Sequence, residues 1–147
     1  MSELVEVSFS LDETLATLKP YQKNTIEQLI EKYGEEGAAQ QWLAASGVSG
    51  TEKFGGERLD SRPFWDSLSY EFQLFICGDK KYKSDREKLM EYGKPTAALA
   101  VTFISGLIAG TLGIAAAAIT PVISILLAIV SKMTANAWCA TRVGKEA

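Results

Sequence analysis

The pattern of apolar and polar positions changes character at Pro95. Upstream of Pro95, apolar residues recur every three or four positions among charged ones, which is typical of amphipathic helices. From Pro95 to Ser131 the chain runs for 37 residues without a charged side chain. The sequence therefore predicts an all-α fold in which an amphipathic helical head precedes a C-terminal apolar helical hairpin.

The head is expected to consist of short helices separated by capping signals, glycine and proline. Ser10-Leu11-Asp12-Glu13 matches a capping box, and Pro20 ends that helix or opens the next one. Four further helices are expected over about residues 20–33, 35–46, 63–77 and 84–92. The apolar positions that recur along these helices are Ile26, Leu29, Ile30, Tyr33, Ala39, Trp42, Leu43, Trp65, Leu68, Phe72, Phe75, Ile76, Leu89, Met90 and Tyr92.

Three further segments of the head have distinct patterns. Residues 4–9 alternate, which predicts a short strand or an extended arm. Residues 47–62 are rich in glycine and charge, which predicts a loop. Ser84-Asp85-Arg86-Glu87 is a second capping-box match and predicts the start of the last helix before the uncharged segment.

The uncharged segment is long enough for two helices joined by a turn, because one bilayer-spanning helix needs about 20 apolar residues. A helix that is apolar on all sides must be enclosed by other helices or by lipid. The four amphipathic faces expected upstream are barely enough to enclose two such helices. We therefore expect this hairpin to be transmembrane.

Two positions for the hairpin turn fit the sequence. Thr120-Pro121 is a helix-start signal, with threonine as the N-cap and Pro121 in the first turn. This placement predicts helices over about 96–118 and 121–141, with Lys132 near the middle of the second. A lysine at the centre of a bilayer costs about 2.5–3.5 kcal/mol.

The alternative turn lies at residues 110–113 and leaves two segments, 95–112 and 114–131, each about 27 Å long as a helix. Lys94 and Lys132 then face the same aqueous side, and Pro121 becomes a kink, which membrane helices tolerate. Helix-start chemistry favours the first placement and lipid desolvation favours the second. With the second, Lys94, Lys132 and Arg142 lie on one side and Trp138 lies at the interface, so both termini are cytoplasmic by the positive-inside rule.

Small residues within the hairpin predict close helix–helix contact. Gly106 and Gly110 form a GxxxG motif, and Thr102 extends the same ridge by one turn. A second ridge consists of Ser105, Ala109 and Gly113. Residues of this size allow two helix backbones to approach closely in lipid, which favours oligomerisation or tight pairing within the hairpin.

Charge divides the chain into the two expected domains. Residues 1–77 hold 13 acidic and 6 basic side chains, whereas residues 78–94 hold 4 acidic and 6 basic ones. We expect an acidic domain over residues 1–94, including a basic hinge over 79–94, and a hydrophobic hairpin with a short polar tail over 95–147. Basic residues near a bilayer bind anionic headgroups. The candidate headgroup-binding residues are Lys80, Lys81, Lys83, Lys94 and Arg142.

Catalytic, metal and cofactor sites are not expected. The chain has no histidine, so neither a Ser-His-Asp nor a Cys-His arrangement can form. Cys77 and Cys139 are too few for a zinc site, and we expect them to be small buried residues in a reducing compartment. The net charge of −3 argues against a nucleic-acid partner. The first residues lack the pattern of a secretory signal.

Two functions remain open from the sequence. The first is a small non-enzymatic bacterial protein of the inner membrane whose hairpin inserts in the bilayer, either to permeabilise it as an effector or to anchor a partner complex. It would self-associate or bind a protein through residues 1–94. In layout alone this is similar to the apolar hairpin of pore-forming bacteriocins and Bcl-2-like proteins. The second is a cytoplasmic all-α adaptor or oligomerisation module with the apolar segment as its core.

Overall fold

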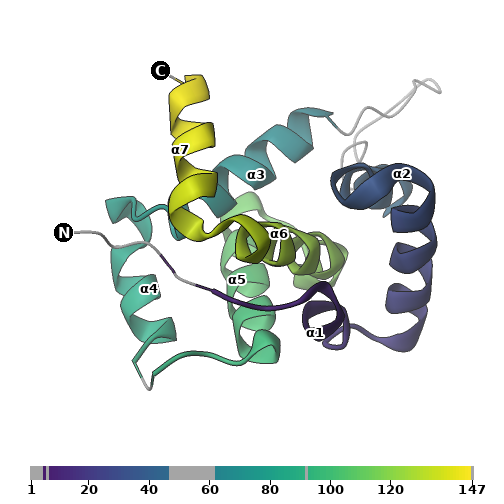
Figure 1. The fold of residues 1–147 in the computed structure, drawn as a ribbon, viewed down its shortest axis with the longest axis horizontal. Coiled ribbons are helices and arrows are strands. Elements are labelled where there is room, and N and C mark those ends of the chain that lie inside the picture. The colour runs from purple at the N-terminus through teal and green to yellow at the C-terminus, as the bar shows by residue number, and fades with distance from the viewer. Residues whose placement is uncertain (1–4, 6, 47–61, 92, 147) are drawn as a thin grey trace.

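A computed structural model describes residues 5, 7–46, 62–91 and 93–146, and the described residues form α-helices without any strand (Figure 1), which confirms the all-α prediction. The α-helices and two 3-10 turns follow one another as α1 (Leu11–Leu15), α2 (Pro20–Ser46), α3 (Arg62–Ile76), η2 (Lys80–Tyr82), α4 (Lys83–Leu89), α5 (Ala97–Leu112), η3 (Ala116–Ala118), α6 (Thr120–Met133) and α7 (Ala135–Glu146).

Helix α6 lies at the centre of the fold, in contact with α1, α2, α5 and α7 (Figure 1). Every residue from Pro121 to Ala128 is buried, including the polar Ser124. Residues from both predicted domains therefore share one hydrophobic core. That residues 1–94 and 95–147 are two separate domains stays a prediction.

The first two helices follow the predicted capping and glycine signals. Ser10 Oγ accepts from the backbone N–H of Glu13 at 3.1 Å, and the Glu13 carboxylate accepts from the Ser10 N–H at 2.8 Å, so the predicted capping box is present. Helix α2 bends at Gly34, whose φ of 81° lies in the left-handed region that glycine adopts without steric cost. The two helices predicted on either side of Gly34 are therefore present and meet at this kink.

The described residues before α1 form an arm without regular secondary structure, which matches the extended-arm alternative. The backbone N–H of Val5 donates to the carbonyl of Ile76 at 3.0 Å, and the N–H of Phe9 donates to Ser131 Oγ at 2.9 Å. The arm therefore crosses from the end of α3 to the end of α6. The predicted loop over residues 47–62 lies outside the described residues, except for Arg62 at the start of α3.

Helix α3 buries the aromatic face expected from its sequence, since Trp65, Phe72 and Phe75 are all within the core. The second predicted capping box is wrong. Helix α4 begins at Lys83 without a side-chain cap, and Asp79 instead caps η2 by accepting from the N–H of Lys81 at 2.8 Å. The helix begins earlier than its capping pattern predicts because a 3-10 turn directly precedes it and already orders its first residues.

The hairpin turn combines the two predicted placements. Helix α5 ends at Gly113, whose φ is 75°, as the placement at residues 110–113 predicts. Helix α6 begins at Thr120 with Pro121 in its first turn, as the other placement predicts, but the predicted N-cap role of Thr120 is wrong, because its hydroxyl donates to the carbonyl of Ala116 at 2.8 Å. The connecting segment contains η3. The placement at residues 110–113 is wrong for the start of α6, and the placement at Thr120 is wrong for the end of α5. Lys132 lies in the last turn of α6 because that helix stops at Met133.

The interpretation of the two cysteines as free thiols is wrong. Cys77, directly after α3, and Cys139, in α7, form a disulfide with a Cα–Cα distance of 5.7 Å. Two cysteines separated by 62 residues give no pairing signal by themselves, because pairing depends on the tertiary fold. The disulfide also removes the basis for inferring a reducing compartment from cysteine usage.

Candidate functional site

The two helices of the hairpin differ in how far the rest of the chain covers them. Helix α5 buries one face, which includes Val101, Ile104 and Ile108, against the core. Its opposite face is exposed and carries the predicted GxxxG ridge. The exposed uncharged residues of this outer α5 stripe are Ala98, Leu99, Thr102, Gly106 and Gly110.

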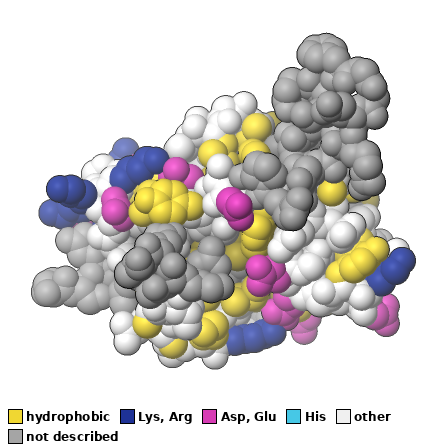
Figure 2. Space-filling view, turned by 90° about the horizontal axis from the view of Figure 1, so that it is seen from above, with side chains coloured by type: hydrophobic (Ala, Val, Ile, Leu, Met, Phe, Trp, Pro, Cys, Tyr) yellow, Lys and Arg dark blue, Asp and Glu magenta, His cyan; other side chains and the backbone are white. Residues whose placement is uncertain are grey.

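The GxxxG ridge does not pack within the described residues. A Cβ atom added at Gly106 or Gly110 would have no neighbour within 4 Å, so these glycines make no close approach to another helix. Gly113 is exposed as well, whereas Ser105 and Ala109 of the second ridge are buried. On the face drawn in Figure 2, hydrophobic side chains form separate groups among charged ones. The outer α5 stripe, by comparison, has no charge along its length.

The tip of the hairpin rests against the two arms of the bent α2. Gln22, before the bend, donates from Nε2 to the carbonyl of Ala117 at 3.4 Å. Trp42, after the bend, donates from its indole nitrogen to the carbonyl of Ala118 at 2.9 Å. Ala115 and Ala117 at the tip are exposed. The tip is therefore held by two side-chain hydrogen bonds and remains partly open to solvent.

The open end of the hairpin brings its two charged boundaries together. Lys94 and Pro95, before α5, and Ser131 and Thr134, at the end of α6, line one cavity of about 450 Å³ beneath residues 7–9 of the arm. Lys132 is exposed and forms an ion pair with Glu35 of α2. The Lys132 side chain is 59% exposed. A pair so exposed contributes at most about 1 kcal/mol to stability.

Thr134 joins α6 to α7 in a backbone conformation that threonine rarely adopts. Its φ is 84° and its ψ is 148°, a combination that costs a non-glycine residue about 1–3 kcal/mol. The Thr134 N–H donates to the carbonyl of Val130 at 2.8 Å, and Thr134 Oγ1 accepts from the N–H of Ala137 at 3.2 Å. Thr134 thus ends one helix and caps the next across a bend of 103°.

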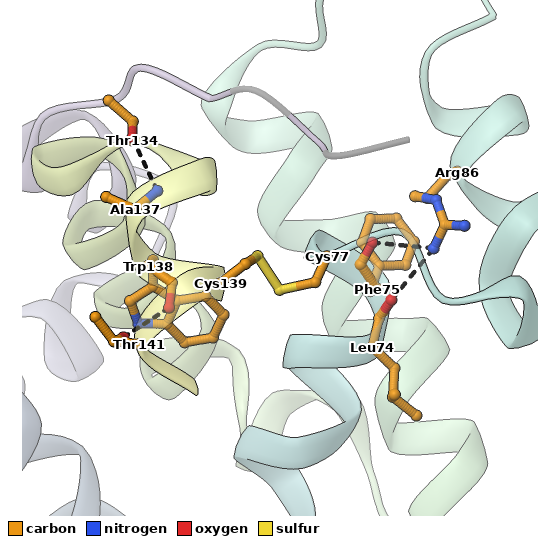
Figure 3. Close-up of a disulfide and its surroundings, with 9 residues drawn as sticks. All are labelled: Leu74, Phe75, Cys77, Arg86, Thr134, Ala137, Trp138, Cys139 and Thr141. Atoms are coloured by element: carbon orange, nitrogen blue, oxygen red, sulfur yellow. Dashed lines mark hydrogen bonds between the residues drawn. A yellow bond between two sulfur atoms is a disulfide. The ribbon is translucent and has the colours of Figure 1, made fainter. Parts of the chain in front are cut away.

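The disulfide connects α7 to a firmly held segment at the end of α3 (Figure 3). The buried Arg86 of α4 donates to the carbonyls of Leu74 at 3.2 Å and Phe75 at 3.1 Å, before Cys77, and to that of Asp79 at 2.7 Å, after it. A cation at the C-terminal end of a helix is favourable because the last carbonyls there lack intrahelical partners. The sequence places Arg86 in a capping-box match and in the predicted basic hinge, and gives no signal for these contacts.

Trp138 lies in the core, and its predicted place at a membrane interface is not seen in this structure. Only 4% of the side chain is exposed, and its ring meets that of Phe72 edge to face at a centroid distance of 5.6 Å. Trp138 therefore packs α7 against α3 next to the disulfide. Arg142 belongs to α7, and its side chain lies outside the described residues.

Of the predicted headgroup lysines, Lys80 and Lys81 lie in η2, Lys83 begins α4 and Lys94 precedes α5. Lys80, Lys81, Lys83 and Lys94 are all exposed. Lys81 Nζ lies 2.8 Å from the Glu71 carboxylate, whose hydrogen bond raises the pKa of Lys81. At the other end of α4, Lys88 and Lys94 line a cavity of about 290 Å³ that they share with residues of α5. Lys88 and Lys94 thus lie beside Leu99, at the start of the outer α5 stripe.

A polar network ties η2 to α3 and α5. The buried Tyr82 hydroxyl donates to the Glu71 carboxylate and lies 3.2 Å from Thr111 Oγ1. Burial raises the pKa of Tyr82, and the hydrogen bond to Glu71 raises it further. The network packs η2 against α3 and α5, and no cluster of metal ligands is found among the described residues.

This network predicts a loss of stability at alkaline pH. Because the folded-state pKa of Tyr82 lies above its usual value of 10.0, its stabilising contribution is complete below that pH and disappears as pH rises through the folded-state pKa. Tyr82→Phe loses about 1.5–3 kcal/mol at pH 7, but its stability falls less steeply above pH 10.0. Urea unfolding midpoints across this pH range measure the difference. Parallel curves for the two proteins would exclude Tyr82 as the titrating group.

Two hydroxyl groups within the hairpin are buried without a hydrogen-bond partner among the described residues. They are Ser105 Oγ in α5 and Ser124 Oγ in α6. A buried polar group without a partner costs about 1–3 kcal/mol. The sequence suggests no such cost, since a serine in a helix normally bonds to a carbonyl of the preceding turn.

No described helix by itself combines the length and the hydropathy of a membrane span. Taken together, α6 and residues 135–141 have the length and the hydropathy of a membrane span, judged by length and composition alone, but the chain bends between them at Thr134. Helix α5 is apolar but shorter. Comparison with known proteins adds no further constraint: no protein-family model, curated protein or solved structure matches the chain.

Proposed function

We propose that this chain is a non-enzymatic membrane-associated protein that inserts the α5–α6 hairpin into a lipid bilayer. The observation that carries the proposal is the shape of the hairpin. Its charged boundaries lie at one end, where Lys94 shares a cavity with Ser131 and Thr134, and its uncharged tip lies at the other. If the tip enters the bilayer first, Lys94 and Lys132, at the opposite end of the hairpin, remain in water.

The lengths of the two segments support this proposal. Residues 95–112 and 114–131 each comprise 18 residues and extend about 27 Å as helices, close to the hydrocarbon thickness of about 30 Å. Reaching that length requires the tip segment around η3 to join α6, with Pro121 as a tolerated kink. Both chain ends then remain on one side of the membrane, which the positive-inside rule assigns to the cytoplasm.

The outer α5 stripe provides the first contact with the membrane. It is exposed and uncharged, and Lys88 of α4 and Lys94 lie beside its first turn, where they share a cavity with Leu99. Each lysine near an anionic surface contributes about 1 kcal/mol, so α5 is expected to lie flat on the headgroups before insertion. Once in lipid, the unoccupied Gly106–Gly110 ridge is available for pairing with a second copy.

Enclosure of α6 supports a second candidate, a soluble all-α adaptor whose apolar segment serves only as a core. Residues 121–128 are fully covered by the rest of the chain, as expected for a core helix. The two candidates differ in what the outer α5 stripe binds, since the adaptor would use it for a protein and the membrane protein for lipid.

Alkaline carbonate extraction of membranes from cells that express the protein tests the proposal. The inserted hairpin is expected to stay in the membrane pellet at high pH, because its apolar residues are buried in hydrocarbon and do not depend on charge. The first 94 residues expressed without the hairpin are unsuitable as a control, since they share its core; a cytosolic protein of similar size serves instead. Recovery of the intact chain in the supernatant both with and without dithiothreitol would favour the adaptor.

A further inference from the structure

We propose that the Cys77–Cys139 disulfide is a redox latch that keeps the hairpin folded against the head until a dithiol reduces it. This inference rests on the proposed function, because it concerns the regulation of the same hairpin. The inference combines three features of the described residues. The end of α3 at Cys77 is held in place by hydrogen bonds, the backbone at Thr134 is strained, and the central helix α6 cannot leave the core unless α7 moves with it.

The anchor side of the latch is held on both sides of Cys77. The Arg86 guanidinium binds the carbonyls of Leu74 and Phe75 before the cysteine (Figure 3) and that of Asp79 after it. The Val5 N–H also donates to the carbonyl of Ile76 at 3.0 Å. The end of α3 is therefore fixed to α4 and to the N-terminal arm, and Cys77 stays in place when the disulfide opens.

The moving side of the latch is α7. Cys139 lies five residues after Thr134, where α7 turns away from α6 by 103°. Since α7 follows α6 directly, α6 cannot leave the core while a covalent bond ties α7 to α3. With the disulfide open, the edge contact of Trp138 with Phe72 is one of the noncovalent contacts that still join the two helices.

Strain at Thr134 favours release. Its φ of 84° is costly for threonine in the folded arrangement. When α7 is free to change its direction relative to α6, residue 134 can adopt an ordinary backbone conformation. The disulfide thus holds a junction that would otherwise relax, which is how strained backbone is used at switch regions.

The chemical step is a thiol–disulfide exchange. A thiolate of the dithiol attacks one sulfur of the Cys77–Cys139 bond to form a mixed disulfide and releases the other cysteine as a thiolate. The second thiol of the reductant then displaces the remaining cysteine. Two cysteine thiols and the cyclic disulfide of the reductant result, and two electrons and two protons pass to the protein. Cys77 is the more exposed residue of the pair and the one more open to attack.

The test measures flotation with vesicles of phosphatidylcholine and phosphatidylglycerol, together with release of a trapped dye. The oxidised protein is compared with the same protein in dithiothreitol and with the double variant Cys77→Ser/Cys139→Ser. We expect at least a tenfold higher rate of insertion for the reduced protein. The double variant should match that rate without reductant and should not respond to dithiothreitol.

Two further variants separate a latch from a general loss of stability. Leu68→Ala opens a cavity in α3 while leaving the disulfide intact, and it should insert as slowly as the oxidised protein. Thr134→Gly removes the strain, so after reduction it should insert more slowly than the reduced parent. Circular dichroism establishes that each protein is helical before vesicles are added.

The outcomes distinguish the latch from the proposed function. Insertion at equal rates in both redox states would overturn the latch and leave the membrane function in place. Absence of insertion in every form would overturn both. Fast insertion of oxidised Leu68→Ala, or a double variant as slow as the oxidised parent, would also overturn the latch. Insertion only after reduction, with no response of the double variant to dithiothreitol, would support it.

Discussion

Replacing Cys77 and Cys139 with serine is expected to lower the free energy of unfolding by about 4 kcal/mol. The bond joins residues 62 positions apart, and the chain-entropy model gives a loss of this size for a loop of that length. Because single domains are stable by only about 5–15 kcal/mol, this is a large share of the total. The melting temperature should fall by roughly 10 °C for a chain of this size.

Urea denaturation of the double variant and of the parent, each with and without dithiothreitol, measures this loss. The reduced parent should match the double variant, since both lack the cross-link. The reductant should leave the double variant unchanged. A loss below about 1 kcal/mol would show that the unfolded chain is already restricted or that the bond strains the native fold.

Gly106→Asp is expected to reduce insertion of the hairpin by about 100-fold while leaving the folded protein intact. Gly106 is exposed, and an added Cβ meets nothing within 4 Å, so the folded state accommodates the change. Glycine and aspartate both disfavour helix interiors to similar degrees. In the inserted hairpin, residue 106 lies near the middle of the first segment, where a carboxylate costs about 2.5–3.5 kcal/mol.

Gly106→Ala is the matched control, because it changes the same position without adding charge and should insert as the parent does. Vesicle flotation of the three reduced proteins gives the insertion equilibrium, and urea denaturation gives the stability of the folded state. If Gly106→Asp inserts as well as Gly106→Ala, α5 does not enter the hydrocarbon. Equal vesicle binding by both would then place the protein on the membrane surface.

The sequence predicts features that depend on local chemistry. The capping box at Ser10, the helix end at Gly34 and the buried aromatic face of α3 were all predicted correctly, because each depends on residues within a few positions of one another. The hairpin turn was predicted only in part, since two competing signals lie seven residues apart and each determines one helix end.

Features that depend on contacts distant in sequence could not be predicted. The disulfide, the burial of Trp138 and the contacts of Arg86 all require α3, α4 and α7 to meet in the folded chain. The strained backbone at Thr134 has no sequence signal at all, since threonine is not a residue that a positive φ favours. The proposed latch therefore rests on tertiary contacts, whereas the hairpin was predicted from the local sequence pattern.

The hydrogen bond from Gln22 to Ala117 indicates how deeply the hairpin would sit in a bilayer. Pro121 has no N–H, so in a helix continued toward the tip the carbonyl four residues earlier, that of Ala117, receives no backbone bond. In the folded protein the Gln22 amide supplies the missing donor at 3.4 Å. After insertion this oxygen needs water instead, which is absent from the hydrocarbon. Ala117 would therefore come to rest at the level of the far headgroups.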